Sequence, residues 1–143
     1  MKINKIDHIC IAVKDLDAAQ KRWEPVLGKT GPDETYQDDI AKVKVARYMI
    51  GEVGLELMQD TTGDGSTAKF IAARGEGIML MGLNVPNTAQ ALEELEQAGY
   101  PLITDPVHGT VLPSPLNCDY GFVHPKGLNG VLLEVIDYKW DRP

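Results

Sequence analysis

Several features are scarce in this sequence, and each scarcity excludes a class of protein. Two cysteines, Cys10 and Cys118, are too few for a disulfide framework and are typical of the reducing cytoplasm. No apolar run approaches the roughly 18 residues of a membrane span, and the start MKINKIDHICIAV has charges where a signal peptide needs an apolar core. The 14 basic residues are outnumbered by 21 acidic ones, which argues against nucleic acid as a partner. We therefore expect a cytoplasmic protein with neither a membrane nor a nucleic-acid partner.

The length of 143 residues and the hydrophobic content of 43% are sufficient for one folded domain with a buried core. Asp15 and Asn87 are suited to begin helices, and Gly28 and Gly99 to end them. The stretch GPDETYQDD at 31–39 is expected to be a polar loop. Strands are expected at 6–13, 42–50, 53–59, 78–85, 120–124 and 131–137, helices at 15–28, 66–74 and 87–99, and one short strand within 101–118, around ITDPV or GTVL.

The order of these elements is repeated. A shift of 72 positions (80 − 8) superimposes the first half of the chain on the second. This shift aligns Val13 with Val85, Asp15 with Asn87, Ala19 with Ala91 and Trp23 with Leu95. Each half is a strand, a helix and two or three further strands. The sequence thus predicts an α+β fold of tandem βαβββ modules, at about 4–60 and 76–138, within one domain that covers 1–143.

Side-chain alternation along the strands places three ionisable residues on the face away from the helices. His8 lies in the first strand, and Glu56 and Glu134 occupy matching places in the motifs LEL and LEV. A buried carboxylate needs a partner, a proton or a cation, and one His with two carboxylates is a plausible metal-binding set. Two alternatives remain open: His8 is an ordinary half-buried residue, or Glu56 faces solvent on an open antiparallel sheet.

These residues and motifs resemble the vicinal oxygen chelate superfamily, which includes glyoxalase I, extradiol dioxygenases and bleomycin-binding proteins. Within it, the resemblance is strongest to the methylmalonyl-CoA epimerase family. The matching segments are IDHICIAVKDLDAA, VGLELMQ, STAKFIAARGEGI and FVHPKGLNGVLLEVID, which span nearly the whole chain. The resemblance implies a curved mixed sheet around a central cavity, a homodimer, and a divalent metal ligated by His8, Glu56 and Glu134.

The sequence departs from this family at two places. A GIHHI-like motif would supply a further metal-ligating His, but here it reads GIMLM, so that Leu80 occupies the ligand position. The epimerase base, a glutamate before the second strand, is also missing; Ile40 aligns with it, and Asp38 and Asp39 are close by. Three ligands with two carboxylates favour harder ions such as Mg²⁺, Mn²⁺ or Fe²⁺, although Co²⁺, Ni²⁺ and Zn²⁺ remain candidates. His124 or Asn84 could replace the lost ligand.

The resemblance implies an isomerase or lyase that acts on a small carboxylated acyl-CoA or a related oxyacid through a metal-stabilised enolate. Glu134 and His8 are then the catalytic residues, and Ser66, Lys69 and Lys126 lie near the CoA phosphates, with Ser66 capping its helix. Without a metal, His8 and a Glu of raised pKa would act directly as an acid–base pair. The alternative to an enzyme is a non-catalytic protein of the bleomycin-resistance type that binds and sequesters a small molecule.

Overall fold

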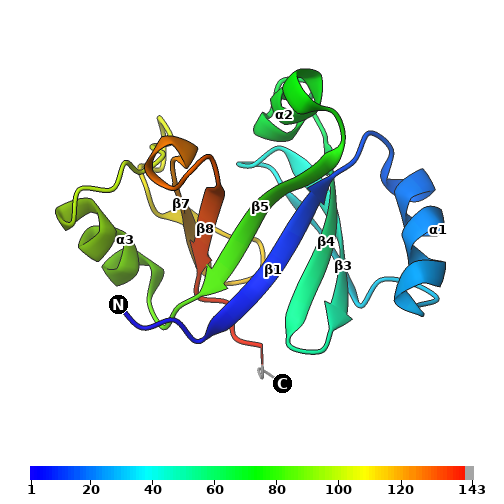
Figure 1. Ribbon diagram of the computed structural model, residues 1–143, viewed down its shortest axis with the longest axis horizontal. Helices are drawn as coiled ribbons and strands as arrows, with labels where there is room; N and C mark the ends of the chain where they lie inside the picture. The colour runs from blue at the N-terminus through cyan, green and yellow to red at the C-terminus, as the bar shows by residue number, and fades with distance from the viewer. Residues whose placement is uncertain (141–143) are drawn as a thin grey trace. The chain divides into compact units, whose positions relative to one another are not determined.

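More residues lie in strands than in helices within 1–140, the part of the chain that this computed structural model describes. The elements are β1 (Lys5–Ala12), α1 (Leu16–Leu27), β2 (Glu34–Asp38), β3 (Val43–Ile50), β4 (Val53–Asp60), α2 (Ser66–Arg74), β5 (Gly77–Asn84), α3 (Thr88–Gln97), β6 (Leu112–Pro113), β7 (Asp119–Val123), the 3₁₀ helix η1 (Pro125–Gly127) and β8 (Leu132–Ile136). Each half has the predicted order of a strand, a helix and further strands (Figure 1). The predicted α+β fold of tandem βαβββ modules is confirmed.

The chain divides into two compact units. One consists of His8–Met79, and the other of Met1–Asp7 together with the chain from Leu80 onward. The strand order is β2-β3-β4-β1 in the first of these and β5-β8-β7-β6 in the second. In both units the first strand of the βαβββ module pairs in parallel with the last, and the remaining pairings are antiparallel. The two predicted modules thus have the same internal topology.

Helix α1 covers one face of the β2-β3-β4-β1 sheet (Figure 1). Trp23 and Leu27 of this helix pack against buried side chains of three strands, among them Ile11, Tyr48 and Leu57. Of these, Ile11 and Leu57 lie on the side that strand alternation predicted to face the helices. The opposite face of the same strands therefore carries His8, Cys10, Gly54, Glu56, Met58, Val45, Arg47, Glu34, Tyr36 and Asp38.

In the other unit, α3 packs against β7 and β8 (Figure 1). Its Ala91 and Leu92 form an apolar cluster with Val85 and Val135. Gly121 of β7 lies directly beneath α3, because a methyl group built on it would collide with Leu92 of that helix. The same methyl group would come within 2.5 Å of the Thr110 carbonyl oxygen. The close packing of helix on sheet here requires glycine.

The helix ends predicted at Asp15, Gly28 and Asn87 are confirmed. Asp15 accepts a hydrogen bond from the Ala18 amide, and Asn87 accepts one from the Gln90 amide, so each side chain caps its helix. Gly28 ends α1 in the left-handed conformation, with φ of 67°. The predicted cap at Ser66 is wrong: Gly65 precedes α2 without a side-chain cap, and Ser66 is the first helical residue.

The region 31–39 was expected to be a loop, but it contains β2, an edge strand that pairs with β3. Its sequence ETYQD has few apolar residues because one of its faces is wet, with Thr35 and Gln37 exposed. The short strand expected within 101–118 is β6, which lies at the end of the GTVL option. Among the described residues, no helix combines the length and apolarity that crossing a membrane requires.

Candidate active site

A row of polar side chains crosses the β2-β3-β4-β1 sheet on the face away from α1. Arg47 lies opposite Glu34 on one side and Glu56 on the other, and Glu56 in turn lies opposite Cys10. Arg47 and Glu56 are each 1% exposed, and Cys10 is 2% exposed. Glu56 is therefore buried, and the alternative that it faces solvent is excluded.

Both oxygens of the Glu56 carboxylate accept hydrogen bonds. The Nε and Nη2 atoms of Arg47 each lie 2.6 Å from Oε2. Oε1 accepts from the Tyr36 hydroxyl at 2.9 Å and from the Cys10 thiol at 3.3 Å. The second carboxylate beside Arg47, that of Glu34, is 3.8 Å from Nη1. Arg47 thus holds Oε2, while Oε1 accepts from Tyr36 of β2 and Cys10 of β1.

The environment of Glu56 favours its ionised form. Burial is the largest influence and raises the pKa, but the charges of His8 and Arg47, with hydrogen bonds from Arg47 and Tyr36, outweigh it. The pKa of Glu56 therefore lies below its ordinary value of 4.5. A carboxylate that is ionised at neutral pH can stabilise a cation or orient a proton donor, but it is not a raised-pKa acid. Glu56 is accordingly not the protonated partner in a metal-free acid–base pair.

The other unit has a related arrangement around Glu134. This residue is 7% exposed and lies in β8 between Gly82 of β5 and Phe122 of β7. Phe122 stands where Arg47 stands in the first module, because each faces the glutamate across the neighbouring antiparallel strand. The two matching glutamates therefore have different neighbours, a cation for Glu56 and an aromatic ring for Glu134.

Asn84 and His124, the two candidates for a replacement ligand, have structural partners. The Asn84 amide donates to Asp7 Oδ2 and to the Tyr138 carbonyl oxygen, each at 2.8 Å, and its Oδ1 accepts from Asn4. The exposed His124 accepts from the Lys126 amide through Nδ1 at 3.0 Å and so caps η1. Both side chains are oriented by these bonds, which explain their presence without a ligand role.

Neither aspartate near the expected base position is oriented like a general base. Asp38 is buried at the end of β2, where its Oδ1 accepts from the Ile40 and Ala41 amides. This is the turn-forming role of aspartate. The side chain of Asp39 is exposed and accepts from Gln37.

Comparison with known proteins identifies the family. Residues 7–112 match the family described as Glyoxalase/Bleomycin resistance protein/Dioxygenase superfamily. The chain belongs to this superfamily. It is 30% identical to the uncharacterized protein YqjC of Bacillus subtilis over 98% of this chain and 96% of that protein.

Solved structures of superfamily members confirm the fold. The crystal structure of methylmalonyl-CoA epimerase from Mycobacterium tuberculosis matches with a TM-score of 0.85 and 26% identity, covering 96% of this chain and 89% of that one. A Streptomyces coelicolor methylmalonyl-CoA epimerase variant, in complex with 2-nitronate-propionyl-CoA, matches with a TM-score of 0.86 and 24% identity over 96% and 99% of the two chains. The glyoxalase-like fold expected from the sequence is therefore confirmed.

Members of this superfamily bind a divalent metal, and part of the donor set in this chain fits one. His8, Cys10 and Glu56 each offer a ligand atom, and these atoms all lie within 4.8 Å of one another. Imidazole, thiolate and carboxylate are all ligands of Zn²⁺ and similar ions. Sequence reasoning brought His8 and Glu56 together but missed Cys10, Arg47 and Tyr36; the only signal for Cys10 was that it shares the parity of His8.

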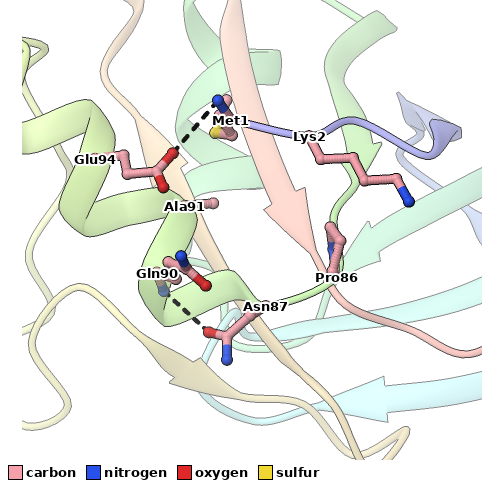
Figure 2. A pocket seen from close by; sticks show the side chains of 7 residues that line it. All are labelled: Met1, Lys2, Pro86, Asn87, Gln90, Ala91 and Glu94. Carbon is pink, nitrogen blue, oxygen red and sulfur yellow. Dashed lines mark hydrogen bonds and ion pairs between the residues drawn. The ribbon is translucent and has the colours of Figure 1, made fainter.

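The residues expected near CoA phosphates are exposed. Ser66 and Lys69 lie one turn apart on α2 and so share a side of this helix. Lys126 belongs to η1 in the other unit. None of these side chains forms the pocket in Figure 2, a hollow of about 110 Å³ between Met1 and Lys2 and the start of α3. That pocket contains none of the expected site residues.

Proposed function

We propose that this chain is an isomerase or lyase of the methylmalonyl-CoA-epimerase type that acts on a small carboxylated acyl-CoA or a related oxyacid. The observation that carries the proposal is the set of buried ionisable side chains on one sheet face, with His8, Cys10, Arg47 and Glu56 each exposed by 2% or less. Burial of so many charged groups lowers the stability of the fold. Clusters of buried ionisable side chains are typical of catalytic and binding sites. We also propose that the enzyme is cytoplasmic and homodimeric.

The reaction begins with removal of a proton beside the thioester, which leaves an enolate. A divalent cation, when bound at His8, would stabilise the negative charge that develops on the enolate oxygen. Arg47 fixes the Glu56 carboxylate through a hydrogen bond from Nε and an ion-pair contact from Nη2, so that its charge is in place before substrate arrives. We assign proton transfer to Glu134 and, where no cation is bound at His8, to His8 as well; both residues are buried.

Binding of the CoA portion is assigned to exposed basic residues. Lys69 and Lys126 would neutralise phosphate charges, and Ser66 would donate from its hydroxyl group near the start of α2. A Streptomyces coelicolor relative of the same fold is in complex with a CoA ester, which supports this choice of ligand class. Lys69→Ala and Lys126→Ala variants should then raise KM for acyl-CoA more than they lower kcat.

Hydrogen exchange at the reacting carbon tests this function. Protein supplied with each of several divalent ions is incubated with methylmalonyl-CoA in D₂O, and deuterium at the carbon between the carbonyl groups is followed by mass spectrometry. We expect exchange by the natural protein and none by Glu134→Gln, with an unchanged circular dichroism spectrum. Glu52→Gln, an exposed carboxylate in the turn between β3 and β4, is the matched control.

The second candidate is a protein that binds and sequesters a small molecule. It is favoured by the hydrogen bonding of Glu56, whose two oxygens accept from three side chains of the same sheet. In this case no ion would support exchange, and calorimetry would show that Glu134→Gln changes ligand affinity only modestly. Binding of methylmalonyl-CoA without exchange would therefore replace the first candidate by the second.

A further inference from the structure

Cys10 occupies a place that the chemistry of the superfamily site does not explain. It lies two residues from His8 on the same face of β1, directly opposite Glu56. Its Sγ is 3.3 Å from Glu56 Oε1. Cysteine is a small apolar residue when it is inert, yet here the thiol points along the row at an ionised carboxylate.

The spacing of the three donor atoms approaches that of a tetrahedral metal site. With metal–sulfur and metal–oxygen bonds of about 2.3 and 2.1 Å, two ligands at a tetrahedral angle are roughly 3.6 Å apart. The Sγ–Oε1 distance of 3.3 Å already lies near this value. The His8 nitrogen completes a set within 4.8 Å, so that small side-chain movements would bring all three onto one ion.

The charges nearby are balanced for a divalent cation with one thiolate. Glu34, Arg47 and Glu56 carry one net negative charge between them, in a row with no exposed member. With His8 bound as neutral imidazole, a divalent ion and a Cys10 thiolate add one positive charge, which makes the cluster neutral. Arg47 holds Oε2 at 2.6 Å, so the ligand atom would be Oε1, which faces Cys10 and also accepts from the Tyr36 hydroxyl; both Arg47 and Tyr36 would then orient the metal ligand from outside.

We infer that His8, Cys10 and Glu56 form a three-ligand site for a thiophilic divalent ion such as Zn²⁺ or Co²⁺, with a fourth position open to water or substrate. On binding, the S–H bond of Cys10 breaks, a sulfur–metal bond forms, and the proton goes to solvent; a protonated His8 also releases its proton to solvent when its nitrogen binds the ion, and nothing is oxidised or reduced. The site lies entirely within the His8–Met79 unit and replaces the harder-ion preference expected from the sequence. It rests on the cation that the proposed function places at His8 and adds Cys10 as its ligand, and metal binding is measurable without any substrate, so that its failure is distinguishable from failure of the proposed reaction.

Cobalt spectroscopy on metal-free protein tests the inference directly. Titration with Co²⁺ should give a sulfur-to-cobalt charge-transfer band in the near ultraviolet that saturates at one ion per chain and is abolished by Zn²⁺. Cys10→Ser should lack the band and bind Co²⁺ more weakly by at least about tenfold. Cys118→Ser should keep it, and is a matched control because these are the only two cysteines in the sequence.

Three results would overturn the inference. They are the absence of the band in the natural protein at saturating Co²⁺, its survival in Cys10→Ser, and its loss in Cys118→Ser. If Cys10→Ser does not fold, Cys10→Ala takes its place: it should likewise lack the band and bind Co²⁺ more weakly, and a band that survives in it would exclude a thiolate ligand.

Discussion

Arg47 and Glu56 face each other across β3 and β4 and form a buried ion pair, with Arg47 Nη2 and Glu56 Oε2 2.6 Å apart. Each residue is 1% exposed, so water stabilises neither charge. Removal of one partner leaves the other charged and buried, which is far more costly than removal of both. The pair therefore makes the sheet face opposite α1 intolerant of single changes.

Arg47→Met should lower the free energy of unfolding by about 3–5 kcal/mol, because it leaves the Glu56 carboxylate without its charged partner. Urea unfolding followed by circular dichroism measures this loss. The double variant Arg47→Met/Glu56→Leu should recover most of it, since neither charge of the pair then remains. Additive losses in the two single variants and the double variant would contradict a coupled pair.

The lowered pKa of Glu56 also predicts how stability depends on pH. The carboxyl has a lower pKa in the folded protein than in the unfolded chain, so its contribution is fully present above the ordinary value of 4.5 and is lost as pH falls below it. Urea midpoints measured from about pH 6 down to pH 3 should fall more steeply for the natural protein than for Arg47→Met/Glu56→Leu. Equal dependence of the urea midpoint on pH in the two proteins would show that Glu56 does not contribute to the loss of stability in acid.

The sequence predicted the helices well because their signals are local. Asp15, Gly28 and Asn87 act on neighbouring backbone groups, and each is found in the expected role. Edge strand β2 was missed for the converse reason. Its formation depends on pairing with β3 across a turn, and its segment ETYQD lacks the apolar alternation typical of a strand.

The candidate site was predictable only in part. Strand parity placed His8 and Glu56 on one face, since alternation is a property of a single strand. The register that sets Cys10 and Arg47 on either side of Glu56 is a relation between strands. A one-residue shift would reverse every side chain, so these neighbours could not be read from the sequence without the pairing.

The contact between α3 and β7 makes a prediction that is independent of function. Gly121→Ala should lower the free energy of unfolding by about 1–3 kcal/mol, because the added methyl group would collide with Leu92 and the Thr110 carbonyl oxygen. Gly31→Ala, where nothing lies within 4 Å of the added methyl group, should change it by no more than about 0.5 kcal/mol. Thermal melts of the two variants compare them directly, and equal melting temperatures would show that α3 can shift to make room.

Cys118 should react slowly with alkylating reagents at neutral pH. Burial, chiefly, raises the pKa of its thiol to about 11, and the negative charges of Asp137, Glu134 and Asp7 contribute, while a hydrogen bond with Ser114 opposes the shift. Because only the thiolate is nucleophilic, the rate of Cys118 modification by iodoacetamide in the Cys10→Ser variant should keep rising with pH beyond the ordinary thiol pKa of about 8.5. A rate that levels off near that ordinary value would mean that the thiol is neither desolvated nor close to these carboxylates. Slow reaction of Cys118 at neutral pH would also allow Cys10 to be followed without interference in the natural protein.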